Sequence, residues 1–338
     1  MNMTFKQIKE YGFDFPNARM WNTPENRSRI AQDAALITTP NTLVPVEFTS
    51  YIDPMVVEIL TAPRNARRLY SEEKKGDWTT SYEKFRVSEM VGGTEEYSDY
   101  ANGVTSDVNV EWMSRKQYIF QTTITYGDRE MDMAAAGRLN LAADKQRAAA
   151  TKIEIDSNKY YLLGVENQEI YGVLNDPNLP DAITATEGTE SGKIVWSEKT
   201  TKEIYDDVLK LFAQLVSQSS GLIDSSTSLI LAMSPAMITR LGSATDFNIN
   251  VKKMLDSYFT SLEIVPIPEL ASLDGEETLM MIAPDVAGQK TGTLAYGLKM
   301  RMGRVIPDMS SFRQKVVAST YGGIIYQPFA VATMTGVA

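Results

Sequence analysis

The most regular pattern of apolar positions lies in the middle of the chain. From near Glu130 to Leu163, small and apolar residues recur every three or four positions, which predicts one helix of about thirty residues. At ~1.5 Å per residue this helix is on the order of 45 Å long, more than one ordinary domain needs. Gly164 breaks the pattern, and Gly137 near its start is a candidate bend point. A helix of this length favours a protein that reaches its neighbours.

Alternation of apolar and polar residues precedes this helix. Three segments have the period of two that is typical of strands: 78–87, 108–113 and 116–126. Residues 92–103 are rich in turn formers and acids, so we expect a long two-stranded hairpin with an acidic, aromatic tip. An isolated hairpin is marginally stable in water and needs a surface, of the same chain or of another copy. Tyr97, Tyr100 and Trp112 favour another copy, because aromatic side chains concentrate at interfaces.

The N-terminal residues are typical of an arm that leads into a folded body. Apolar residues are sparse in 1–45, and four prolines interrupt them. One short helix is expected there, from Pro24 to about Leu36. A strand at 46–51 and a helix with Asp53 as its N-cap then begin the body.

A small basic cluster follows at the end of that helix. It consists of Arg64, Arg67 and Arg68. The favoured interpretation is a solvated helix end, where cations are stabilised by the helix dipole. The alternative is a role in pairing with acidic neighbours.

The second half of the chain predicts an α/β region. Residues 181–199 have the composition of a linker. Thr200 and Glu203 fit a capping box that opens a helix, and Ser234 with Pro235 caps the next helix. The other expected elements are helices at 235–242 and 251–259 and strands at 227–233, 262–267, 278–283 and 293–300. Residues 312–334 are expected to form two long strands, joined at Tyr321-Gly-Gly323, that complete the sheet of the first region.

Composition narrows the class of protein. The 338 residues include no cysteine and no histidine, which excludes disulfides, thiolate or imidazole metal sites, cysteine nucleophiles and histidine bases. No apolar run approaches the about 20 residues that span a bilayer, and no signal-peptide pattern is present. A net charge of −10 argues against a protein held on nucleic acid by counterion release. It fits ordinary solubility, or a container wall that does not grip the polyanion inside.

The densest acidic group lies in the expected hairpin tip. Glu95, Glu96 and Asp99 could serve as a general acid and base or bind calcium. Solvated acids are the favoured interpretation in an exposed turn, since catalytic carboxylates need a buried or convergent pocket. No glycine-rich phosphate-binding motif occurs. The sequence therefore predicts no catalytic, cofactor-binding or metal-ligating residue, and no cofactor.

Three segments carry a resemblance to a known family. They are Ala142-Ala-Asp-Lys-Gln-Arg-Ala-Ala-Ala150, Ile170-Tyr-Gly-Val-Leu-Asn-Asp-Pro177 and Ile325-Tyr-Gln-Pro-Phe-Ala330. With the order of arm, hairpin, long helix, inserted α/β region and returning strands, essentially the whole chain resembles the major capsid proteins of tailed bacteriophages with the Hong Kong 97-type fold. The resemblance implies an α+β fold with an N-arm, an E-loop hairpin, a long spine helix, a peripheral domain and an axial domain.

The resemblance also implies a division of the chain. The N-terminal arm would be 1–45, the peripheral domain 46–71, 119–180 (with the spine helix at 130–163) and 301–338, the E-loop 72–118, a linker 181–194 and the axial domain 195–300. Some family members cross-link the E-loop through a lysine, but the expected tip at 91–107 contains none, so no cross-link is expected. The short arm and Met1 lead us to expect no proteolytic processing and a separate scaffold protein.

The implied function is a structural one. The chain would self-assemble into hexamers and pentamers of an icosahedral phage head, in the host cytoplasm, and enclose double-stranded DNA without sequence-specific binding. Scaffold, portal and decoration proteins are its expected partners; a membrane is not. The alternatives are an encapsulin-like nanocompartment shell and, from another class, a carboxylate-dependent enzyme. The residues expected at contacts between subunits are Tyr97, Tyr100, Trp112, Glu95, Glu96, Asp99, Arg64, Arg67, Arg68 and Trp21.

Overall fold

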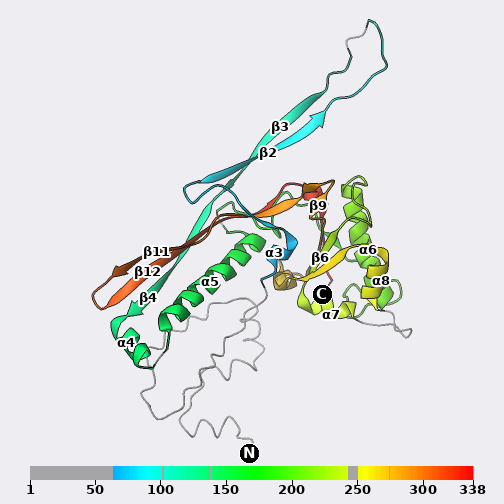
Figure 1. Ribbon diagram of the computed structural model, residues 1–338. Helices are drawn as coiled ribbons and strands as arrows, with labels where there is room; N and C mark the ends of the chain where they lie inside the picture. The colour runs from blue at the N-terminus through cyan, green and yellow to red at the C-terminus, as the bar shows by residue number, and fades with distance from the viewer. Residues whose placement is uncertain are drawn as a thin grey trace, which may run out of the picture. The chain divides into compact units, whose positions relative to one another are not determined.

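The computed structural model describes residues 64–100, 103–137, 139–166, 168–242, 250–273 and 275–337. Several expectations concern residues outside these ranges: the N-terminal arm, its short helix, the strand at 46–51, the helix that begins at Asp53, and Trp21. Two larger sheets and a long hairpin organise the described part of the chain (Figure 1).

The first sheet has four strands in the order β1-β11-β12-β4. They are β1 (Glu72–Lys74), β11 (Gly292–Pro307), β12 (Ser311–Ile325) and β4 (Tyr118–Gly127). β11 and β12 form a long antiparallel hairpin, β4 pairs antiparallel with β12, and β1 adds a short parallel edge. Helix α5 (Leu141–Leu163) lies along this sheet, where Ile153 packs with Ile124 and Val316 (Figure 1).

The second sheet has five strands in the order β5-β13-β8-β6-β7. They are β5 (Ile183–Thr184), β13 (Val331–Thr335), β8 (Thr278–Ile282), β6 (Leu229–Met233) and β7 (Leu262–Pro266). β6 and β8 are buried at every position, so their sequences, Leu-Ile-Leu-Ala-Met and Thr-Leu-Met-Met-Ile, lack the alternation of a half-exposed strand. Helices α6 (Thr201–Gln218), α7 (Pro235–Leu241) and α8 (Val251–Tyr258) belong to this region.

The predicted helix starts of this region are confirmed. Thr200 and Glu203 form the capping box of α6. The Ser234 hydroxyl caps α7, with Pro235 at the first helical position. These helices begin where a side-chain oxygen satisfies a backbone N–H that no helical carbonyl can reach. No helix among the described residues is long and apolar enough to cross a membrane.

The core covers both faces of the second sheet. On one face, Leu231 packs with side chains of α6, α7 and α8. On the other face, Ile230 packs with Leu162 at the end of α5 and with Leu69 of the short helix α3 (Ala66–Leu69). Since α5 contributes to the packing of both sheets, it connects the two regions through their cores.

The hairpin that precedes α5 consists of β2 (Tyr82–Val91) and β3 (Asp107–Lys116). The strands pair antiparallel without a register shift, from Tyr82 opposite Lys116 to Val91 opposite Asp107. This pairing confirms the predicted hairpin but moves its limits: Trp78 lies in a turn before the first strand. The third predicted strand begins at Tyr118 and leaves the hairpin to pair with β12.

The prediction of one helix from near Glu130 to Leu163 is wrong. The structure has α4 (Asp128–Ala136), a break, and α5. The candidate bend at Gly137 is the end of α4, where its N–H bonds back to the Met133 carbonyl oxygen (3.0 Å). Asn140 then caps α5, because its Oδ1 accepts the Ala143 N–H (3.3 Å). The uninterrupted helix is therefore α5, with 23 residues.

The prediction for the C-terminal strands is also wrong. Tyr321-Gly-Gly323 lies inside the single strand β12, not at a turn between two strands. The following strand, β13, pairs with β8 and β5 of the second sheet and so does not complete the first one. Conversely, β11 continues to Pro307, beyond the predicted end at Met300, and completes the first sheet with β12. The C-terminal part of the chain thus adds β11 and β12 to the first sheet and β13 to the second sheet.

Residues 181–199 do not form the free linker that their composition predicted. β5 pairs parallel with β13. Ala185 and Trp196 are buried in the cluster that covers one face of the second sheet. The Trp196 N–H also bonds to the Val337 carbonyl oxygen (3.0 Å). This segment is part of the α/β region.

Candidate functional site

The β2–β3 hairpin has two chemically different faces. Its register places even-numbered residues of both strands on one face and odd-numbered residues on the other. The even set, called here the basic face, is Tyr82, Lys84, Arg86, Ser88, Met90, Val108, Val110, Trp112, Ser114 and Lys116. The odd set, called here the acidic face, is Glu83, Phe85, Val87, Glu89, Val91, Asp107, Asn109, Glu111, Met113 and Arg115. The basic face holds three cations and no acid, whereas the acidic face holds four acids and one cation.

The rest of the chain covers the two faces differently. Near the base of the hairpin, the acidic face lies against the body: the Phe85 ring meets the Tyr326 ring edge-on, with centroids 5.3 Å apart. The basic face exposes its large apolar side chains, with Trp112 64% and Met90 90% accessible. Within the described part of the chain, no acidic side chain forms an ion pair with Lys84 or Arg86. The basic face is thus an exposed apolar surface with cations among the apolar groups.

A buried ion pair fastens the base of the hairpin. Arg115 at the end of β3 pairs with Asp176, and both side chains are almost completely buried. The Arg115 guanidinium lies 5.1 Å from the centroid of the Tyr171 ring, and Asp176 Oδ1 accepts the Asn178 N–H (3.0 Å). Because separating such a pair leaves a buried charge without a partner, the hairpin base is firmly held to the body.

The motif at 171–177 is therefore more than the turn that the sequence predicted. The turn itself is present: Asn175 Oδ1 accepts the Gly172 N–H (2.7 Å), and its Nδ2 donates to the Leu163 carbonyl oxygen (2.7 Å). These bonds fold the segment back over the end of α5 and carry Asp176 to Arg115.

A second anchor lies where β3 leads into β4. Gln117 Nε2 donates to the Asp77 carbonyl oxygen (3.1 Å) and to Ser319 Oγ (3.0 Å). A Cβ at Gly297 would lie only 2.1 Å from that nitrogen, so a side chain there would displace the Gln117 amide from these bonds. The hairpin therefore departs from the first sheet at a fixed point.

The tip of the hairpin carries the exposed aromatic residues. Tyr97 and Tyr100 are 87% and 99% accessible. The Tyr97 hydroxyl donates to Asp99 (2.6 Å), and this bond raises the pKa of Tyr97. Glu95 and Glu96 are exposed beside them. No group of three or more acidic side chains among the described residues is arranged to hold a metal ion.

The three arginines near the described N-terminal end each have an acidic partner in the same chain. Arg64 pairs with Glu154. Arg67 pairs with Glu72 (2.7 Å), and Arg68 pairs with Glu263 (2.6 Å). Arg67 and Arg68 thus join α3 to β1 and β7, and Arg64, which precedes α3, pairs with α5. A contact of the arginines with another subunit stays a prediction.

A groove of about 700 Å³ lies at the far end of β4, away from the hairpin. Tyr126 at the end of β4, α4, the start of α5 and the distal parts of β11 and β12 line it. Its apolar wall includes Met131, Val305 and Phe312, and its acidic side chains are Asp128 and Asp132. Both aspartates are exposed. The groove therefore combines apolar surface with negative charge.

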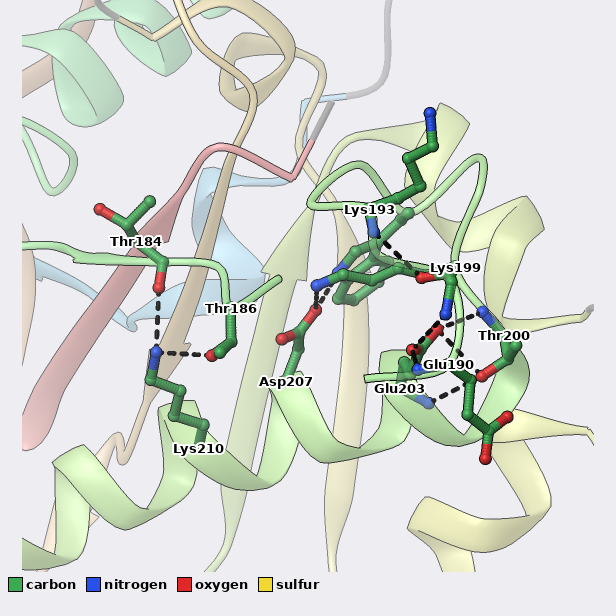
Figure 2. A network of polar contacts seen from close by, with 11 residues as sticks. Thr184, Thr186, Glu190, Lys193, Lys199, Thr200, Glu203, Asp207 and Lys210 are labelled. Atoms are coloured by element: carbon green, nitrogen blue, oxygen red, sulfur yellow. Dashed lines mark hydrogen bonds and ion pairs between the residues drawn. The ribbon is translucent and has the colours of Figure 1, made fainter. Parts of the chain in front are cut away.

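Three side chains on one stripe of α6 hold the segment before that helix (Figure 2). Glu203 Oε1 accepts the N–H groups of Glu190 (2.7 Å) and Ser191 (3.0 Å). Asp207 Oδ2 accepts Trp196 Nε1–H (2.9 Å) and pairs with Lys199. Lys210 donates to the Thr184 carbonyl oxygen and the Thr186 hydroxyl, at 3.1 and 2.7 Å. The spacing of four and three residues places all three on the same side of the helix.

Electrostatics in this network favour the charged form of Glu203. Backbone N–H groups of Ser191, Thr200 and Glu190 lower the pKa of Glu203 to about 2. Lys199 and Asp207 are both buried, and each charge is compensated by the other. The network therefore holds the segment before α6 against that helix (Figure 2).

The sequence did not indicate the two buried ion pairs. Asp176 lies 61 residues from Arg115, and no local pattern links them. For the closer pair, Lys199 and Asp207, the spacing across a helix start is a signal, but the composition of the segment before the helix predicts a linker. The expected contact residues Tyr97, Tyr100 and Trp112 are all exposed, as predicted; their contact with another subunit is untested.

Comparisons with known proteins consistently find capsid proteins. The family model described as "Pa193 gp26 major capsid protein" matches residues 35–336. No curated protein sequence matches the chain. Solved structures match over most of its length: the capsid of Myoviridae phage XM1 has a TM-score of 0.71 at 11% identity, covering 87% of this chain and 99% of that chain.

Two further solved structures extend this similarity. The capsid of the native GTA particle has a TM-score of 0.62 at 10% identity and covers 90% of this chain and 99% of its own. The mature capsid of bacteriophage PhiM1 has a TM-score of 0.56 at 10% identity, with 85% of this chain and 91% of that chain covered. At such identities the likeness concerns the fold.

Proposed function

Because the chain belongs to the Pa193 gp26 major capsid protein family and is a tailed-phage capsid shell protein, we propose that it assembles into hexamers and pentamers of an icosahedral head that encloses double-stranded DNA. Its fold is the Hong Kong 97-type α+β fold of phage capsids. The family match does not favour an encapsulin-like nanocompartment. It also speaks for a structural role and against the carboxylate-dependent enzyme.

The observation that carries this proposal is the β2–β3 hairpin, whose basic face is left exposed by the part of the chain that the structure describes. A two-stranded ribbon with no core of its own exposes Tyr82, Trp112 and Met90 on one face and two tyrosines at its tip. Large exposed apolar surfaces on a soluble subunit mark contact sites. Repeated in every subunit, one such contact per copy supplies the many weak interactions from which a closed shell forms.

The domain division is part of the same proposal. The hairpin corresponds to the E-loop at 72–118, and the spine helix corresponds to α5 with α4 before it. The axial domain is built on the second sheet, and β13 is assigned to it rather than to the peripheral domain. The N-terminal arm at 1–45 and the contact residue Trp21 complete the proposed set of contacts.

Further parts of the proposal concern partners and contents. The net charge of −10 supports enclosure of DNA without a strong grip on it. The tip at 91–107 contains no lysine, so the shell is proposed to hold by non-covalent contacts. Scaffold, portal and decoration proteins are the proposed partners, and assembly is proposed to take place in the host cytoplasm.

A deletion tests the proposed contact without disturbing the body. Replacement of 91–107 by Asn-Gly keeps Met90 opposite Val108 and closes the hairpin with a two-residue turn. We expect the wild-type chain, expressed with the proposed scaffold protein, to form closed shells in negative-stain micrographs, and the variant under the same conditions to remain as folded subunits with wild-type circular dichroism. Wild-type-like shells from the variant would contradict the E-loop assignment.

A wild-type chain that forms only one small, discrete oligomer, also when it is expressed with the proposed scaffold protein, would contradict the shell function itself. Assembly is compared in two reactions, one with linear DNA and one with an equal mass of neutral polymer. The comparison tests whether the shell protein binds DNA or only encloses it. Equal shell yields are expected with both, because the acidic chain does not recruit the polyanion.

A further inference from the structure

We propose that the basic face of the β2–β3 hairpin docks into the acidic groove at the far end of β4 on another copy of the chain. This inference rests on the proposed function, since it assigns both surfaces of one subunit contact. In this contact the basic face of one copy occupies the groove of the next copy, and the acidic face is turned away from that neighbour.

The segregation of side chains on the ribbon is the first argument. Of the six large apolar residues of β2 and β3 that are strongly exposed, five lie on the basic face: Tyr82, Met90, Val108, Val110 and Trp112. The same face carries Lys84, Arg86 and Lys116 and no acid. Apolar groups mixed with charge of one sign suit a partner surface that is apolar and of the opposite sign.

The groove has that composition. Phe312, Met131 and Val305 supply apolar wall, and Asp128 and Asp132 are its exposed charged side chains. Both aspartates belong to α4, the helix that the break at Gly137 separates from α5. The break therefore matters for the contact, because it lets α4 turn its acids to the groove at the end of the sheet.

Geometry excludes a contact between the two surfaces of a single chain. The hairpin joins β4 at Tyr118, whereas the groove begins at Tyr126, toward the other end of the strand. Figure 1 shows β2 and β3 at one end of β4 and α4 at the other. A strand of 10 residues spans on the order of 30 Å. The buried pair of Arg115 and Asp176 holds the hairpin base in place, so the ribbon does not fold back.

The contact therefore joins two different surfaces of successive copies. Such a heterologous contact continues from copy to copy and closes into a ring when the rotation between copies allows it. Rings of this kind are what hexamers and pentamers require. The buried apolar side chains supply attraction, and the charges fix which face of the ribbon turns inward.

Charge reversal on each surface tests the proposal. Lys84→Glu with Arg86→Glu should lower the yield of closed shells roughly tenfold or more, because like charges then meet across the contact. Asp132→Lys with Asp128→Asn should do the same from the groove side. The combination of all four changes should restore assembly, since the charges are exchanged. Yields are measured by sedimentation and negative stain, and circular dichroism with thermal unfolding confirms that the subunits are folded.

The acidic face provides the matched control. Glu89→Lys with Glu111→Lys makes an equally large change of charge on the same two strands, and shells should form as in wild type. Shells from the Lys84 and Arg86 variant, equal damage from the control, or no restoration in the combined variant would overturn this contact while the shell function stands. A wild-type chain that never assembles, also when it is expressed with the proposed scaffold protein, would overturn both.

Discussion

The β2–β3 hairpin and the second sheet use their strands for opposite purposes. Every residue of β6 and β8 is buried, and the two strands lie between helices on one side and the end of α5 on the other. In β2 and β3 nearly every residue is exposed or half exposed, and Arg115 at the base is the buried exception. The second sheet is thus covered by its own chain, whereas the described part of the chain leaves most of the hairpin exposed.

Because of this difference, we expect the second sheet to determine the stability of the subunit and the hairpin to determine its assembly. Burial of apolar side chains stabilises the second sheet whether or not a neighbour is present. The hairpin gains little from its own chain beyond its base, so its exposed side chains contribute when another copy covers them. Changes in the sheet should therefore alter unfolding, and changes in the hairpin should alter assembly. The following tests, on unassembled subunits unless stated, are ordered by expected effect.

Asp207→Ala should cause the largest loss of stability. It leaves the buried ammonium of Lys199 without its partner and removes the acceptor of Trp196 Nε1–H. Removal of one member of a buried pair costs about 3–5 kcal/mol of unfolding free energy. Urea denaturation measures it. As a control, Lys199→Met with Asp207→Leu removes both charges and should recover most of the loss; an equal loss in the double variant would contradict the role of the pair.

Leu231→Ala tests burial in the second sheet. Its side chain is fully buried in β6, and truncation to alanine in such a site costs about 2–5 kcal/mol through lost burial and the cavity left behind. The hairpin offers the matched control Val110→Ala, which should change the unfolding free energy by no more than about 0.5 kcal/mol because Val110 is exposed. Similar losses for both variants would remove the distinction between the regions.

Acid should weaken the attachment of residues 190–191 to α6. The folded pKa of Glu203 is about 2, below its usual value near 4.5, so its charged form stabilises the fold fully above that usual value. This stability is lost as pH falls from about 4.5 towards 2. The difference in unfolding free energy between wild type and Glu203→Gln should therefore shrink between pH 5 and pH 3. A constant difference over this range would contradict the assignment.

Trp112→Ala should have the smallest effect on stability and a clear effect on assembly. Its side chain lies on the basic face and is largely exposed, so the unfolding free energy should change by no more than about 0.5 kcal/mol. Closed shells, counted in micrographs of assembled samples, should decrease, because an aromatic anchor of the contact is lost. Trp112→Phe keeps an aromatic ring and should assemble better than the alanine variant. A destabilisation of 2 kcal/mol or more would contradict the assignment of Trp112 to an exposed face that contributes to assembly and not to stability.

Local features were the ones that could be predicted from the sequence. The capping box at Thr200 and the Ser234-Pro235 start of α7 are confirmed, because a cap depends on residues within one helical turn. The alternation in β2 and β3 predicted a hairpin for the same reason. The break before α5 did not follow from the periodicity, because apolar positions recur at helical spacing on both sides of it; Asn140 carries the local signal of an N-cap.

Long-range features could not be predicted in this way. Nothing in the alternation of β13 distinguishes a strand of the first sheet from one of the second; its pairing with β8 decides it. The pair of Arg115 and Asp176 and the groove formed by α4, β4, β11 and β12 likewise join residues far apart in the chain. The alternation in β2 and β3 separates the side chains of the basic face from those of the acidic face. Only the register and the contact at the hairpin base show that the basic face is the exposed one.

The sequence by itself determined the local elements, the absence of cysteine and histidine chemistry, and an acidic, aromatic hairpin, because these depend on composition and on neighbours along the chain. The tertiary structure alone decided which sheet receives each returning strand, which charges are buried in pairs and which face of the hairpin lies open. These outcomes depend on packing between distant segments, where burial of apolar surface and the cost of an unpaired charge outweigh local preference.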